Sequence, residues 1–146
     1  PIWCPDGEHL MMNLNWNGNG RRFVETRYDG SGMRTLCDLP AGRGHPSRHP
    51  DGRHMITDAY PLEPMAPGDG TAPLWWIDLE RNTQETLVRI DAVAAPFQHD
   101  IASSFAMRVD LHPAWDRDCT RVAINGVMDG SRHVFVADLA ERLRSH

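Results

Sequence analysis

Several features are scarce in this chain of 146 residues. It has three cysteines, Cys4, Cys37 and Cys119, and no two of them have the C-x-x-C spacing. An odd number of cysteines without this spacing argues against a disulfide framework and against a zinc knuckle. It fits a reducing compartment, so we expect a cytoplasmic location. No apolar run approaches the roughly 20 residues of a membrane-spanning helix, so the sequence predicts no membrane segment.

An excess of basic charge is also lacking. The formal net charge is -5, which argues against sequence-independent electrostatic binding of nucleic acid. The sequence has no Gly-rich phosphate-binding loop and no nucleophile elbow, and its Ser, His and Asp residues do not occur in the order of a catalytic triad. The content of hydrophobic residues, 40%, and of charged residues, 24%, is close to the globular average, so the chain has enough apolar groups to fold.

What the sequence does contain is a repeated unit. Residues 1–12, 45–56 and 112–123 share the pattern H-P-x-W-x-P-D-G-x-x-φ-φ, in which φ is an apolar residue. The first copy begins at its proline, and in the third copy the Pro-Asp-Gly turn has become Arg117-Asp118-Cys119. Self-similarity at this spacing is the signature of a repeat architecture.

Each unit reads as an antiparallel meander of roughly four short strands. Pro-Asp-Gly favours a turn, because proline presets φ and glycine tolerates positive φ. An apolar strand, a polar hairpin and a second strand follow the turn. The expected strands are 10–14, 23–28 and 33–37 in the first unit, 55–57, 74–79 and 85–90 in the second, and 122–124 and 134–139 in the third.

These units predict an all-β protein, a partial β-propeller of about three antiparallel four-stranded blades. The expected blades are residues 1–44, 45–111 and 112–146, and the second is long because it carries two insertions. Three blades do not close a ring, since propellers use roughly 4–8. We therefore expect N-terminal blades to be missing from this fragment, or another chain to close the ring. An unrelated β-sandwich of three hairpins is the alternative.

Two histidines occupy the same place in two of the units. Because equivalent positions of a propeller point toward one axis, His45 and His112 are expected to converge. Asp110 lies two residues before His112, so on a strand the two would share a face. Imidazole with a carboxylate suits manganese, iron or zinc. The alternative is a structural role, in which a histidine before proline bonds to the backbone of a neighbouring turn.

The tryptophans are interpreted as packing residues. Trp3 and Trp115 stand at the repeat's own tryptophan position and are expected to pack between blades. Trp75 and Trp76 are adjacent on an expected strand, so one is predicted to face inward and the other outward. We expect the outward one to pack on the next blade rather than on a sugar.

The repeat resembles known families. The pattern H-P-x-W-x-P-D-G, with a strand ending in Asp-Leu, resembles the WD40-like repeats of TolB-type periplasmic propellers, which are mostly interaction scaffolds. The pair His45-Pro46, the insertion carrying 58–61 and the run 107–113 are similar to oligogalacturonate lyases. Those are seven-bladed propellers that cleave short pectic fragments by β-elimination. The resemblance covers nearly the whole chain, as the last blades of the ring.

This resemblance implies a metal site. In the lyase family three histidines and a glutamine hold a divalent metal, typically manganese. Two of the histidines match His45 and His112, the third falls on Asp110, and the glutamine falls on Met107. A carboxylate suits manganese and a methionine does not. The lost ligand would be replaced by water, or by Gln98 or His99 from the insertion.

The resemblance also implies a function. It implies a metal-dependent lyase-like propeller that cleaves acidic uronate oligosaccharides, with Arg48 and Arg108 binding carboxylates of the substrate in a bidentate fork. The alternative for these arginines is a solvated charge at a strand edge. The family's catalytic histidine would precede Pro1 and its arginine would lie further upstream, so no catalytic base is assigned and the fragment alone is expected to be inactive. The alternative function is a non-catalytic TolB-like scaffold that binds a protein or small ligand, with a periplasmic location.

Overall fold

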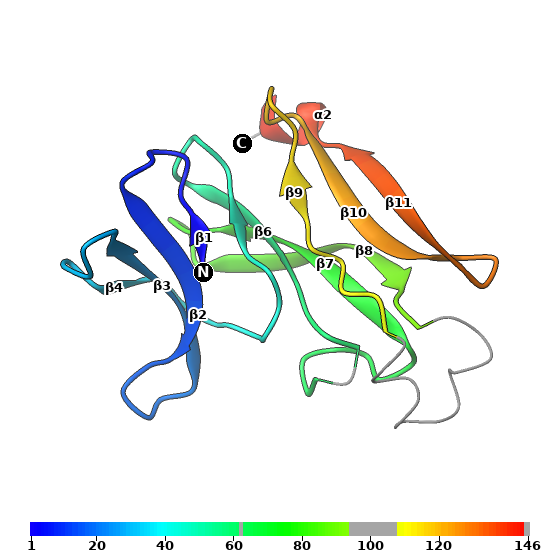
Figure 1. The fold of residues 1–146 in the computed structure, drawn as a ribbon, viewed down its shortest axis with the longest axis horizontal. Coiled ribbons are helices and arrows are strands. Elements are labelled where there is room, and N and C mark those ends of the chain that lie inside the picture. The colour runs from blue at the N-terminus through cyan, green and yellow to red at the C-terminus, as the bar shows by residue number, and fades with distance from the viewer. Residues whose placement is uncertain (62, 94–107, 145–146) are drawn as a thin grey trace.

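The computed structural model describes residues 1–61, 63–93 and 108–144, which form three antiparallel sheets and one short helix (Figure 1). The first sheet has the order β1 (Ile2–Trp3), β2 (His9–Asn15), β3 (Arg21–Arg27) and β4 (Arg34–Pro40). The second has the order β5 (Ser47–Arg48), β6 (His54–Asp58), β7 (Thr71–Asp78) and β8 (Thr83–Asp91). The third has β10 (Arg121–Met128) between β9 (Ala114–Trp115) and β11 (Ser131–Asp138), and α2 (Ala140–Arg144) follows it.

The three sheets are built from one repeated unit, as the sequence predicts. In each sheet the first two strands pair in the same register: Trp3 lies opposite Leu10, Arg48 opposite Met55, and Trp115 opposite Val122. The expected strands are present and each is longer than predicted, although β3, β7 and β11 end one residue earlier and β4 begins one residue later. The first two sheets have the four strands expected of a blade, and the third has three within the described residues.

The turn between the first two strands is also conserved in geometry. The carboxylates of Asp6 and Asp51 each accept hydrogen bonds from two backbone amides that follow them. In the third sheet the carboxylate of Asp116 accepts the corresponding two hydrogen bonds from backbone amides. Cys119 adopts the left-handed φ of 54° at the position where the second unit has Gly52 with a φ of 77°. The degenerate third copy therefore keeps the turn with different residues.

The sheets pack face to face, so the middle one is covered on both sides (Figure 1). Leu74 and Trp76 of β7 join a buried cluster with residues of the third sheet, whereas Ile77 joins one with residues of the first sheet. Trp75 and Trp76 are both buried. The expected outward tryptophan thus packs within the protein, because a neighbouring sheet covers that face of the strand.

The two tryptophans of the repeat differ. Trp115 is half-buried against the core between the second and third sheets, as predicted. Trp3 is 58% exposed, because no sheet lies against the outer side of the first one in this structure. In the part of the chain that the structure describes, no helix has the length and apolar character that a membrane span requires.

Candidate metal centre

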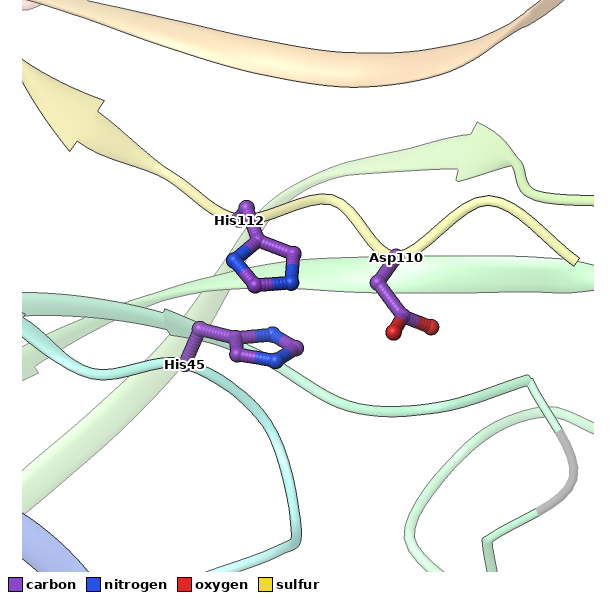
Figure 2. Close-up of side chains that lie close together, drawn as sticks. All are labelled: His45, Asp110 and His112. Carbon is purple, nitrogen blue, oxygen red and sulfur yellow. The ribbon is translucent and has the colours of Figure 1, made fainter. Parts of the chain in front are cut away.

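His45, Asp110 and His112 lie close together, although the chain separates them widely. His45 lies in the loop between β4 and β5, and Asp110 and His112 lie in the segment that leads to β9 (Figure 2). Each offers a ligand atom, and these atoms lie within 4.8 Å of one another. The two imidazole rings are stacked, with centroids 3.5 Å apart. The structure thus brings together the three predicted ligands, and their binding of a metal stays a prediction.

The backbone between Asp110 and His112 differs from the expectation. The two residues were predicted to share one face of a strand, but the segment 109–113 has no regular secondary structure. His112 adopts a left-handed φ of 45°. Proline follows it, which disfavours the helical region for the residue before. The convergence of Asp110 and His112 on His45 therefore comes from an irregular turn rather than from strand alternation.

Asp58, at the end of β6, connects the two segments that carry the ligands. Its side chain is fully buried. One carboxylate oxygen accepts the backbone N–H of His45 at 2.5 Å, and the other lies 3.1 Å from Nδ1 of the same residue. The backbone N–H of His112 also donates to Asp58, at 3.3 Å. The sequence alone assigns no role to Asp58. It belongs only to the segment 58–61, which is one of the features similar to the lyases.

The contact with Asp58 determines which nitrogen of His45 faces the cluster. A neutral imidazole that donates its Nδ1–H to a carboxylate keeps Nε2 free as a ligand atom, and such partners orient many metal-binding histidines. Burial alone lowers the pKa of His45, but the hydrogen bond and charge of Asp58, with the charge of Asp110, outweigh it, so the pKa is raised. The surroundings of His45 therefore favour the charged form of its ring.

Gly44 allows the loop to approach Asp58 closely. A Cβ atom at this position would lie 1.8 Å from the backbone oxygen of Asp58, so a side chain does not fit. On the other side, Nδ2 of Asn13 donates a hydrogen bond to the carbonyl oxygen of Gly44 at 2.8 Å. The residue before His45 is thus fixed between the first sheet and the second.

Of the two arginines predicted to bind substrate, Arg108 lies at the cluster. Its Nε donates to Oδ1 of Asp110 at 2.8 Å, and its guanidinium lies 4.1 Å from the centroid of the Tyr60 ring. Burial raises the pKa of Tyr60, and the charge of Asp110 adds to this, so the phenol stays neutral. Arg108 therefore orients one proposed ligand directly.

Arg48 lies elsewhere. It forms an ion pair with Glu25 at 2.8 Å and donates to the carbonyl oxygen of Gly52. The hollow that it lines contains none of the three proposed ligands. Its side chain links the second sheet to the first through Glu25, so we do not include Arg48 in the proposed site. The other sequence candidates, Met107, Gln98 and His99, lie outside the described residues.

The donor set fits a divalent transition metal. Two imidazoles and one carboxylate are ligands that suit manganese, iron and zinc. A purely structural role would give the rings hydrogen bonds to turn backbone. Within residues 1–61, 63–93 and 108–144 we see no such bond, since the ring of His45 binds the carboxylate of Asp58 and that of His112 stacks on His45. The described side chains thus include a His/Asp/His group that could hold a metal ion.

Comparisons with known proteins agree on the architecture. No family model matches the sequence, and no curated protein matches it. Among solved structures, an oligogalacturonate lyase in complex with manganese matches 98% of this chain with a TM-score of 0.65 and 21% identity. TolB from Acinetobacter baumannii matches 93% with a TM-score of 0.57 and 15% identity. This chain is part of a β-propeller.

The propeller fragment is shorter than the proteins it resembles. It covers 35% of the lyase chain and 29% of the TolB chain, so it spans about a third of each. Its three sheets are consecutive blades of the kind that both of those propellers contain. The β-sandwich alternative is thereby set aside, because the fold matches propellers over 98% and 93% of the chain.

Proposed function

We propose that this chain supplies the metal-holding part of a propeller that cleaves acidic, uronate-containing oligosaccharides by β-elimination. The observation that carries the proposal is the convergence of His45, Asp110 and His112, whose ligand atoms lie within 4.8 Å of one another. The similar fold of an oligogalacturonate lyase that was solved with manganese supports it. Three blades do not close a ring, so other blades or another chain would complete the protein.

In this proposal each residue of the cluster has a defined part. His45 would hold the metal through Nε2 while Asp58 accepts its Nδ1–H, and His112 and Asp110 would provide the other ligands. A bound divalent cation, with manganese as the favoured ion, would neutralise the carboxylate of the uronate and stabilise the enolate-like charge that develops beside it. Arg108, which lies over Tyr60, holds the carboxylate of Asp110 in place.

The remaining chemistry belongs to residues beyond this cluster. In β-elimination a base removes the C5 proton of the uronate, the C4–O bond breaks, and a C4=C5 double bond forms as the next sugar leaves. We assign no base to the described residues of this chain. The proposal therefore places the proton-abstracting group in residues that would precede Pro1.

The experiment is a metal and product assay on the protein with its ring complete. We expect manganese, measured by mass spectrometry after dialysis, to remain bound at one equivalent in the wild type and to be lost in His45→Ala and His112→Ala. His9→Ala is the matched control, because His9 is the first residue of β2 in the first sheet and pairs with Asp6. Trigalacturonate should yield an unsaturated product, which is followed by its ultraviolet absorbance. A wild-type protein that retains no divalent metal would contradict the proposal.

The likeness to TolB supports a second candidate, a non-catalytic scaffold that binds a protein or small ligand. A scaffold needs neither the metal nor the base. The scaffold is favoured if the complete wild-type protein retains no metal and forms no unsaturated product. It also requires that His112→Ala leaves the binding of the protein or small ligand unchanged.

A further inference from the structure

Two arginines line a hollow beside the proposed metal cluster. The hollow has a volume of about 570 Å³, and His45, His112, Tyr60, Arg21 and Arg43 contribute to its wall. We propose that Arg21 and Arg43 bind a second carboxylate of an anionic oligosaccharide whose first carboxylate lies at the metal cluster. This inference rests on the proposed function and adds the residues that would recognise the neighbouring sugar.

The charge environment of these two arginines differs from that of most arginines in the described residues. Many arginines of the described residues form ion pairs with aspartate or glutamate: Arg27, Arg34, Arg48, Arg53, Arg81, Arg89, Arg108, Arg121 and Arg142. Within the described ranges, neither Arg21 nor Arg43 has such a pair. Acidic residues outnumber basic ones in this chain, 20 to 15. Arg21 and Arg43 also line a second hollow together with Glu63, so one carboxylate lies near them. Two guanidinium groups near a single carboxylate leave an excess of positive charge here, which attracts an anion.

The backbone holds both arginines on the wall that carries His45. Arg43 is two residues before His45, and its N–H donates to the carboxylate of Glu63 at 2.9 Å. The N–H of Ala41 donates to the carbonyl oxygen of Arg21 at 3.0 Å, which joins the end of β4 to the start of β3. The carboxylate of Glu63 is thus held by the backbone of Arg43, and within the described residues it forms no ion pair with either guanidinium group.

The chemistry of the guanidinium group fits this ligand. It presents parallel N–H donors that match a carboxylate in a bidentate fork, which a neutral sugar hydroxyl does not offer. A uronate chain carries one carboxylate on every sugar. A sugar with its carboxylate at the metal cluster therefore brings the carboxylate of its neighbour into the adjoining hollow. The arrangement selects an oligouronate over a single uronate.

The test measures binding rather than turnover, on the protein with its ring complete and manganese bound. Calorimetric titration with trigalacturonate should show an affinity at least tenfold weaker in Arg43→Gln and in Arg21→Gln, because each loses hydrogen bonds to a charged partner. The affinity for galacturonate and for manganese should stay unchanged. Arg117→Gln is the control, since Arg117 is an exposed arginine in the turn before β10.

The possible outcomes distinguish a failure of this inference from a failure of the proposed function. Unchanged trigalacturonate affinity in both variants, with manganese still bound, would overturn the role of the two arginines and leave the metal centre intact. A wild-type protein that binds manganese but no trigalacturonate would contradict the substrate class itself. Arg43→Lys keeps the charge and loses the fork, so an affinity between those of the wild type and Arg43→Gln would support bidentate recognition.

Discussion

The buried carboxylate of Asp58 lies 3.1 Å from Nδ1 of His45 and also accepts the backbone N–H of His45 and of His112. One side chain at the end of β6 thereby holds two segments that carry proposed ligands. It contacts the ring of His45 and holds the backbone of His112 just before β9. The proposed metal centre therefore depends on a residue that does not belong to its ligand set.

Replacing Asp58 should weaken the metal centre without removing a ligand. We expect Asp58→Asn to lower manganese affinity by about 10–100-fold, as is typical for the loss of a carboxylate partner behind a ligating histidine. Asp58→Ala should also destabilise the fold, because it leaves buried N–H groups without an acceptor at a cost of about 1–3 kcal/mol each. Manganese titration followed by electron paramagnetic resonance measures the first effect and urea unfolding the second.

The matched control is Asp29→Asn, in an exposed hairpin of the first sheet. It should leave manganese affinity at the wild-type value. An Asp58→Asn protein with wild-type affinity would show that the ring of His45 is held in place by its other contacts.

Gly44 offers a second test of the same loop. Gly44→Ala would place a Cβ atom 1.8 Å from the backbone oxygen of Asp58, so the loop has to move. We expect a loss of about 1–3 kcal/mol in the free energy of unfolding, as for other overpacked sites, together with weaker manganese binding.

The neighbouring Gly42 provides the comparison. A Cβ atom there would lie 2.8 Å from a carboxylate oxygen of Glu63, which is the end of a flexible side chain and can turn away. Gly42→Ala should therefore cost less stability than Gly44→Ala and leave manganese binding unchanged. Equal effects of the two substitutions would count against a special fit between Gly44 and Asp58.

Much of the fold could be predicted from the repeat. The spacing of turns and apolar runs located the strands, and the equivalence of His45 and His112 predicted that the two rings would meet, because repeated units place equivalent residues similarly. The third turn was recognised although Cys119 stands where glycine is expected. What the pattern did not reveal is that the carboxylate of Asp116, next to Trp115, bonds the amides of that turn.

The details of the site could not be predicted in this way. Asp58 belongs to the site through contacts with residues distant in sequence, and no local pattern marks such contacts. Arg48 is close to His45 in the chain, yet its side chain turns toward Glu25 between the first and second sheets. Irregular backbone places Asp110 and His112, and periodicity describes only regular strands.

The ion pair at the end of β7 predicts a dependence of stability on pH. The pKa of Asp78 lies well below its usual value of 3.8, first because Arg53 donates hydrogen bonds to it, although burial opposes this. A carboxyl group whose folded pKa is depressed adds stability above its unfolded pKa and loses that contribution as the pH falls through the folded pKa. The contribution of Asp78 should therefore be complete at neutral pH and decline below about pH 3.8.

Asp78→Asn tests this directly. Urea unfolding at neutral pH should show a loss of about 2 kcal/mol, because hydrogen bonds to a charged group are lost. The difference from the wild type should shrink in acid, where the wild-type carboxyl also takes up a proton. Asp129→Asn, in an exposed hairpin, should follow the wild type at every pH. A difference that stays constant down to strongly acidic pH would contradict the ion-pair explanation.

The two tryptophans of the repeat report whether a further blade covers the first sheet. Trp115 donates its indole N–H to the carbonyl oxygen of Ser47 and lies edge-on to Trp76, both in the preceding sheet. Trp115→Ala should therefore lower the free energy of unfolding by about 3 kcal/mol, as for other tryptophans removed from a packed interface. Trp3 holds the equivalent position but is 58% exposed. In the 146-residue chain Trp3→Ala should change stability by less than about 0.5 kcal/mol, as expected for a surface substitution.

In a closed ring the same substitution should behave differently. A preceding sheet would cover Trp3 as the second sheet covers Trp115, so the cost of Trp3→Ala should rise toward that of Trp115→Ala. Urea unfolding of both variants, in the short chain and in the complete ring, measures the change. If Trp3→Ala remained without effect in the complete ring, the expectation that a preceding blade packs against the first sheet would be wrong.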